Sequence, residues 1–173
     1  PNMRAAQLYL RSKYWQDRDK IIEQLINDSR IDQIIWRNEN TLTNCSYHVK
    51  TKTRGILEFG VSNGEPGTSE IESAKDEYGN HWQWKGDLAT LDGDVSADGV
   101  LRFEEYPNAF ERIATVFDEE VSGDLWITCR PGHEFKLDGI SVHQNGSHGS
   151  LHTEDSLSPL IMAGFAENLM PAK

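Results

Sequence analysis

An amphipathic helix pattern followed closely by a short apolar run restricts the fold of this chain most. Residues 107–118 have apolar side chains at helical spacing, and Pro107 suits a first helical turn. The apolar side chains of this helix are Phe110, Ile113, Ala114 and Phe117. The run Leu125–Cys129 predicts a buried strand. Because helices and strands alternate only in part along the chain, we expect an α/β or α+β fold.

Further local patterns complete this prediction. Asp17–Asp28 has isoleucine and leucine at helical spacing and is predicted to be a helix. Strands and hairpins are predicted at Ile31–Arg37, Cys45–Thr53, Gly55–Ser62, Tyr78–Gly86 and Pro159–Gly164. We expect the strands at 125–129 and 159–164 to be central and buried. The hairpins at about 31–90 are expected to form a smaller antiparallel layer.

Length and charge limit the classes of function. With 173 residues the chain has room for one domain, since domains typically take about 100–200 residues. It has 17 Lys and Arg against 28 Asp and Glu, a net charge of −11. This balance disfavours a nucleic-acid-binding surface or an anionic membrane surface. Apolar runs are only a few residues long, so we expect a soluble protein without a membrane span.

The cysteines and the first residues say little about the compartment. Cys45 and Cys129 are too few for a disulfide framework, and two reduced thiols are favoured over one disulfide. The sequence opens at Pro1 without Met or a signal peptide, which favours an internal start within a longer polypeptide. Localisation is therefore left unassigned.

A glycine-rich stretch at 132–158 has the densest group of potential metal ligands. Its histidines are His133, His143, His148 and His152, with Glu134, Glu154 and Asp155 nearby. Imidazole and carboxylate are ligands that zinc prefers, and glycines let such residues converge. The alternative is a polar surface loop whose histidines cap turns.

The segment Asp94–Glu105 resembles a calcium-binding loop. Asp94, Ser96 and Asp98 take positions 1, 3 and 5, Gly99 position 6, and Glu105 position 12. The preceding residues form a poor entering helix, and a second such loop is missing from the sequence. The alternative is therefore a solvated acidic turn.

Residues 146–164, GSHGSLHTEDSLSPLIMAG, carry a resemblance to a known family. The relevant elements are His148-Gly149-Ser150, Asp155, Pro159-Leu160-Ile161 and Gly164. They resemble the closing metal motif of the alkaline phosphatase superfamily, particularly its type I phosphodiesterase/nucleotide pyrophosphatase branch. Further upstream, Tyr106-Pro107, Ala109, Arg112-Ile113, Ser122–Leu125 and Gly132–Phe135 look like the helix and strand that precede this motif.

The resemblance implies a two-metal phosphoryl-transfer site, usually with Zn²⁺, and the C-terminal part of an alkaline-phosphatase-like sheet. It makes His148 one metal ligand and leaves His152 and His143 as weaker metal or substrate-side candidates. The family's nucleophile, its Asp-x-x-x-His pair and its Asp-His-Gly motif do not occur in this sequence. We therefore expect no catalytic residue in this chain, which alone is inactive.

The resulting hypothesis is the C-terminal portion of a metal-dependent phosphodiesterase or phosphatase acting on a small phosphate ester. Its partner is the N-terminal catalytic part of the same polypeptide, and dimerisation of the fragment through exposed apolar surface is expected. The alternative is a self-contained accessory or binding module, stabilised by calcium through Asp94, Ser96, Asp98 and Glu105.

Overall fold

A single nine-stranded sheet organises the part of the chain that the structure describes. The computed structural model describes residues 3–39, 45–62, 64, 70–136, 138–139 and 146–159. The strands are β1 (Ala5–Leu8), β2 (Ile31–Glu39), β3 (Cys45–Thr51), β4 (Ile56–Val61), β5 (Glu72–Asp76), β6 (His81–Gly86), β7 (Gly93–Val95), β8 (Val100–Phe103) and β9 (Leu125–Cys129). The helices are η1 (Ser12–Asp17), α1 (Arg18–Ile26), η2 (Leu88–Leu91), α2 (Ala109–Asp118) and α3 (Thr153–Ser156).

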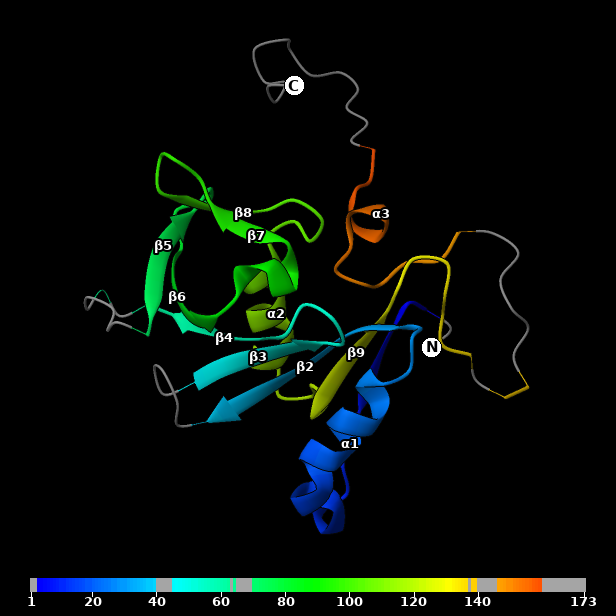
Figure 1. Cartoon of the computed structure of the whole chain (residues 1–173). Coiled ribbons are helices and arrows are strands. Elements are labelled where there is room, and N and C mark those ends of the chain that lie inside the picture. Colours follow the sequence, from blue (N-terminus) through cyan, green and yellow to red (C-terminus); the bar gives the residue numbers. More distant parts are fainter. Residues whose placement is uncertain are drawn as a thin grey trace.

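The sheet is mixed but almost entirely antiparallel. Its strand order is β1-β9-β2-β3-β4-β6-β5-β8-β7, and only the β5–β8 pair is parallel among the described strands. Figure 1 shows that the sheet bends, so that β5, β6, β7 and β8 rise beside and over α2. The N-terminal strand β1 and the late strand β9 therefore lie at the end of the sheet opposite to β7.

The two main helices cover opposite faces of this sheet (Figure 1). On one face, α2 inserts Phe110 against Phe59 of β4, with the two rings stacked at a centroid distance of 3.8 Å. On the other face, Ile22 and Ile26 of α1 pack against residues of β2 and β9. Leu151, which is fully buried, belongs to the α2 core, so the segment just after His148 is tied to the main fold.

Most of the local predictions are confirmed. The helices predicted at 17–28 and 107–118 are α1 and α2, and the hairpin predicted at 45–62 is formed by β3 and β4. All five residues of β9 are buried, as their apolar run predicts. The fold is of the α+β type.

The predicted arrangement of strands needs two corrections. The strands at 31–90 do not form a separate layer, because they hydrogen-bond into the same sheet as β9. Strand β9 is not central but second from the edge, between β1 and β2. The local patterns carry no information on this pairing, which joins strands about ninety residues apart. The strand predicted at 159–164 lies outside the described residues except for Pro159, which is not in a strand.

The hairpin predicted at Tyr78–Gly86 is longer than its sequence pattern indicated. It starts at Glu72, and its turn is held by Asp76. The carboxylate of Asp76 accepts the backbone N–H groups of Tyr78 and Asn80 at 3.0 and 2.8 Å. It also accepts the indole N–H of Trp82 at 2.8 Å, so these hydrogen bonds outweigh burial and lower the pKa of Asp76. Asp76 thus stabilises the turn between β5 and β6.

Candidate functional site

Met3 and Arg4 connect the Gly132–Phe135 and Gly146–Ser150 segments through backbone hydrogen bonds. The N–H of Phe135 donates to the carbonyl of Met3 at 3.0 Å, and the N–H of Arg4 donates to the carbonyl of His148 at 3.0 Å. The carbonyl of Arg4 in turn accepts the N–H of Cys129 at 2.7 Å. Figure 1 shows this N-terminal end beside the late, yellow and orange part of the chain. The Gly132–Phe135 and Gly146–Ser150 segments are therefore held at one end of the sheet.

A buried ion pair fixes the loop that follows His148. The Arg4 guanidinium lies 2.8 Å from Asp155 Oδ1, with side-chain exposures of 7% and 0%. The other oxygen of Asp155 accepts the N–H of Ser150 at 2.9 Å. Asp155 therefore closes the Ser150–Asp155 loop on itself and attaches it to the residue that precedes β1.

A second arginine holds the same loop from α2. Arg112 donates to the carbonyl of Leu151 at 2.9 Å and to that of Ser150 at 3.2 Å. Burial lowers the pKa of Arg112, against the opposing effect of the Asp155 charge. Two backbone carbonyls are thus satisfied by a half-buried guanidinium, which restrains the loop on the side of the core.

The His148 imidazole is exposed and uncommitted, although its backbone is anchored. Its side chain makes no hydrogen bond or ion pair with the rest of the described chain. The next residue, Gly149, has a φ of +110°, and a Cβ there would lie 3.5 Å from the Cβ of Met3. Because a side chain is strained at this φ, glycine allows the chain to turn sharply beside His148. The loop therefore presents one imidazole from a restrained backbone.

His152, four residues later, is used in a different way. Its Nδ1 accepts the N–H of Glu154 at 3.2 Å and caps α3, and its Nε2 lies 2.9 Å from Glu105 Oε2. Since Nδ1 accepts, the neutral ring holds its proton on Nε2 and donates it to Glu105. The rings of His152 and Tyr106 also make a T-shaped contact at a centroid distance of 5.6 Å. Both nitrogens of His152 are therefore occupied within the chain, and His143 lies outside the described residues.

Behind this loop lies a buried polar chain that the sequence analysis missed. Tyr106 Oη donates to Asp32 Oδ2 at 2.8 Å, and the Arg54 guanidinium lies 2.9 Å from Asp32 Oδ1. Burial, together with the charge of Asp32, raises the pKa of Tyr106, so its hydroxyl stays a donor. Asp32 lies on β2, Arg54 in the β3–β4 turn, and Tyr106 in the segment between β8 and α2. No local spacing links them.

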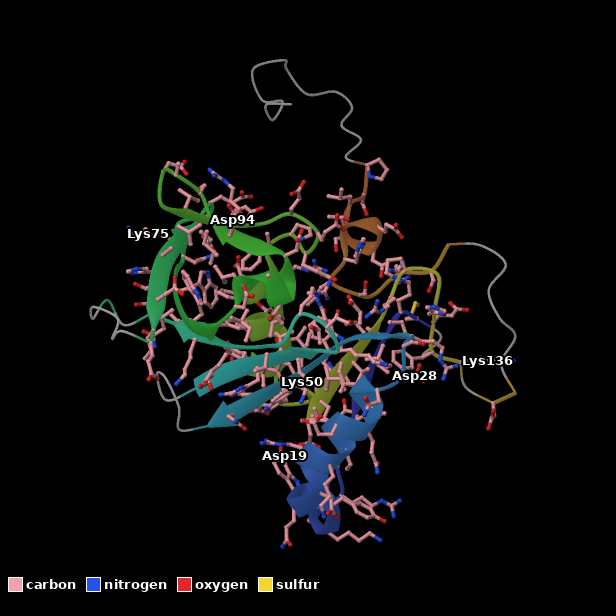
Figure 2. The ribbon with its side chains drawn as sticks, viewed as in Figure 1. Asp19, Asp28, Lys50, Lys75, Asp94 and Lys136 are labelled. Atoms are coloured by element: carbon pink, nitrogen blue, oxygen red, sulfur yellow. The ribbon has the colours of Figure 1, made fainter. Side chains whose placement is uncertain are left out.

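The calcium-like segment Asp94–Glu105 is divided between two structures. Asp94 lies on β7 and Leu101 on β8, so strands rather than helices flank the turn at 96–99. Asp98 accepts the Ser96 hydroxyl and pairs with Arg102 at 3.2 Å. Glu105 instead pairs with His152, as described above. Figure 2 shows Asp94 on this hairpin, far from Asp28 and Lys136.

Two cavities among the described residues have volumes of about 440 Å³ and about 460 Å³. The second lies between β2 and the segment after β9, and its lining includes Asp28, Cys129, Phe135 and Lys136. Figure 2 labels Asp28 and Lys136. Burial raises the pKa of the Cys129 thiol to about 11, so this cysteine is protonated at neutral pH and is a poor nucleophile.

Within residues 3–39, 45–62, 64, 70–136, 138–139 and 146–159, no group of three or more His, Cys, Asp or Glu side chains is placed to hold a metal ion. Of the two histidines described in this loop, His148 has an imidazole free to bind a metal, whereas both ring nitrogens of His152 are engaged.

Comparison with family models, curated proteins and solved structures finds no match for this chain. Among the described residues, every helix is too short or too polar to cross a membrane.

Proposed function

We propose that this chain is the C-terminal portion of a metal-dependent phosphodiesterase or phosphatase, in which His148 supplies one ligand to a zinc ion. The observation that carries the proposal is the contrast between the two histidines of the loop. His148 has a free imidazole on an anchored backbone, whereas both ring nitrogens of His152 are engaged. A metal ligand needs the former condition, because coordination requires a free nitrogen lone pair.

In this proposal, each residue of the loop has its own role. His148 binds the metal, and Gly149 lets the chain turn beside it. Arg4, Asp155 and Arg112 are positioning residues, which restrict where the imidazole lies relative to the sheet. When bound, zinc would act as a Lewis acid on a phosphoryl oxygen.

The substrate class is a small phosphate ester, and the remaining metal ligands and the nucleophile come from an N-terminal catalytic part of the same polypeptide. The sheet described above would then be the C-terminal part of an alkaline-phosphatase-like sheet, as the resemblance implies. One ligand cannot hold two metal ions, so the chain alone is expected to be inactive.

The test uses the longer polypeptide that contains this chain. His148→Ala should lower bound zinc and slow hydrolysis of a simple phosphodiester such as bis(p-nitrophenyl) phosphate by about 100-fold or more, since even residues that only orient a ligand contribute about 10- to 100-fold. His133→Ala, an exposed histidine in the neighbouring segment, is the control and should behave as wild type. Unchanged zinc content and hydrolysis in His148→Ala would refute the proposal.

A further inference from the structure

Three large apolar side chains are exposed together at the end of β1 opposite to Arg4. Tyr9 is 66% exposed, Trp15 50% and Val121 78%. The Tyr9 hydroxyl donates to the carbonyl of Val121 at 2.8 Å, which joins the segment after β1 to the loop after α2. Isolated exposed apolar residues are common, but a contiguous group of them often marks an interaction surface.

Charges of both signs adjoin these apolar side chains. Trp15, Arg18, Glu119 and Glu120 all line the cavity of about 440 Å³. Arg18 donates to Asn38 at 2.9 Å on one side of it. Within the described part of the chain, Glu119 and Glu120 are exposed and make no ion pair. We call Tyr9, Trp15, Val121, Arg18, Glu119 and Glu120 the Trp15 patch.

The Trp15 patch joins a basic segment to an acidic loop. Residues 9–20 contain four Lys and Arg and two Asp and Glu, whereas residues 118–124 contain four Asp and Glu and no Lys or Arg. The segment around Trp15 is therefore net positive, and the loop around Val121 is net negative. A contact that brings the basic segment of one copy against the acidic loop of another is electrostatically favourable.

We propose that the Trp15 patch is the interface of a two-fold dimer of this chain. In a two-fold contact a surface meets its own copy, so an apolar centre bordered by both signs of charge is self-complementary. Trp15 and Val121 of the two copies pack together, and Arg18 of each copy faces the free Glu119 and Glu120 of the other. Tryptophan, tyrosine and arginine are also the residues most enriched among those that dominate binding energy.

This dimer leaves the proposed metal-binding end open. Tyr9 follows β1, whereas Arg4, which holds His148, precedes it. The inference does not rest on the phosphoesterase proposal, and either can fail without the other.

The first test is sedimentation equilibrium of this chain over a range of concentrations. Wild type should sediment as a dimer, and Val121→Glu and Trp15→Glu should each weaken the dimer roughly 30-fold or more, the effect of losing a central apolar contact. Val61→Glu is the matched control, because Val61 is 57% exposed but lies on β4, outside the patch. Circular dichroism establishes that each variant is folded. A monomeric wild type, or equal weakening by Val61→Glu, would overturn the proposal.

A charge exchange tests the pairing itself. Arg18→Glu and Glu120→Arg should each dimerise poorly, because each brings like charges together across the two-fold axis. An equimolar mixture of the two variants should restore dimers, since the Glu introduced in one variant then faces the Arg introduced in the other. Failure of the mixture to dimerise more tightly than either variant alone would refute the proposed two-fold arrangement.

Discussion

The acidic hairpin at 94–105 and the histidine loop at 146–156 both look like cation sites in the sequence, but they satisfy their charges in opposite ways. In the hairpin, Asp98 accepts a hydrogen bond from Ser96 and pairs with Arg102, and both partners lie at the surface within four residues of it. In the loop, Asp155 pairs with Arg4 from the other end of the chain, and its side chain is fully buried. In the hairpin, Asp98 is neutralised by a neighbouring side chain and needs no bound cation. In the loop, the Arg4–Asp155 ion pair holds the segment that carries the free imidazole of His148.

Removal of Arg4 should show the largest difference between these regions. Arg4→Met is expected to lower the free energy of unfolding by about 3–5 kcal/mol, because Asp155 would be left as a buried charge without its partner. The measurement is urea-induced unfolding followed by tryptophan fluorescence. Arg102→Met, which breaks the exposed pair of the hairpin, is the matched control and should unfold as wild type does.

Equal effects of Arg4→Met and Arg102→Met would contradict this comparison. The double variant Arg4→Met with Asp155→Leu sharpens it further. Replacing both partners of a buried ion pair with apolar side chains is often far less costly than removing one. The double variant should therefore recover much of the stability lost in Arg4→Met, if the unpaired Asp155 is the cause.

The buried chain behind the loop should show a smaller effect. Tyr106→Phe removes the hydrogen bond to Asp32 without changing the packing of the ring, and should cost about 1–3 kcal/mol of unfolding free energy. Tyr14→Phe, on an exposed ring of η1, is the control and should leave stability unchanged. A Tyr106→Phe variant as stable as wild type would show that the hydroxyl contributes nothing to the loop's support.

The same tyrosine gives a test by pH. Burial raises the pKa of Tyr106 in the folded state above its usual value of about 10, so its contribution to stability is complete below that pH. As the pH rises above about 10, the unfolded state loses this proton first and the contribution declines. The stability difference between wild type and Tyr106→Phe should therefore shrink from pH 9 to pH 11. A constant difference would contradict the shift.

The contrast between the regions also explains what could be predicted from the sequence. Helix α2 and strand β9 were predictable because each buries one continuous pattern, such as Phe110, Ile113 and Phe117 of α2 or the four apolar residues of β9. The single sheet was not, because the pairing of β9 with β1 and β2 depends on contacts between distant segments.

The residues of the candidate site were likewise predictable only in part. His148 was predicted as a ligand from its motif, and this assignment stays a prediction. The roles of Arg4, Asp32 and Arg54 had no sequence signal, since an arginine near the N-terminus has no periodic or spaced relation to Asp155 or Tyr106. Glu105 was grouped with Asp98 because both fit one loop pattern, although the fold turns its side chain to His152 instead.

Calcium should have the smallest effect of all, and it tests the alternative of a calcium-stabilised module directly. The Asp98 carboxylate already has Arg102 and Ser96 as partners, and Glu105 is paired with His152, so a calcium ion would have to displace these contacts. We expect calcium at about 1 mM, enough to fill a weak loop site, to leave the thermal unfolding midpoint of this chain unchanged. The measurement is differential scanning calorimetry with calcium and with EDTA, on wild type and on Asp98→Asn. A calcium-dependent rise in the midpoint that Asp98→Asn abolishes would show that the hairpin binds the ion. The hairpin would then bind a cation with residues close together in the sequence, whereas the proposed site at His148 depends on contacts between distant segments.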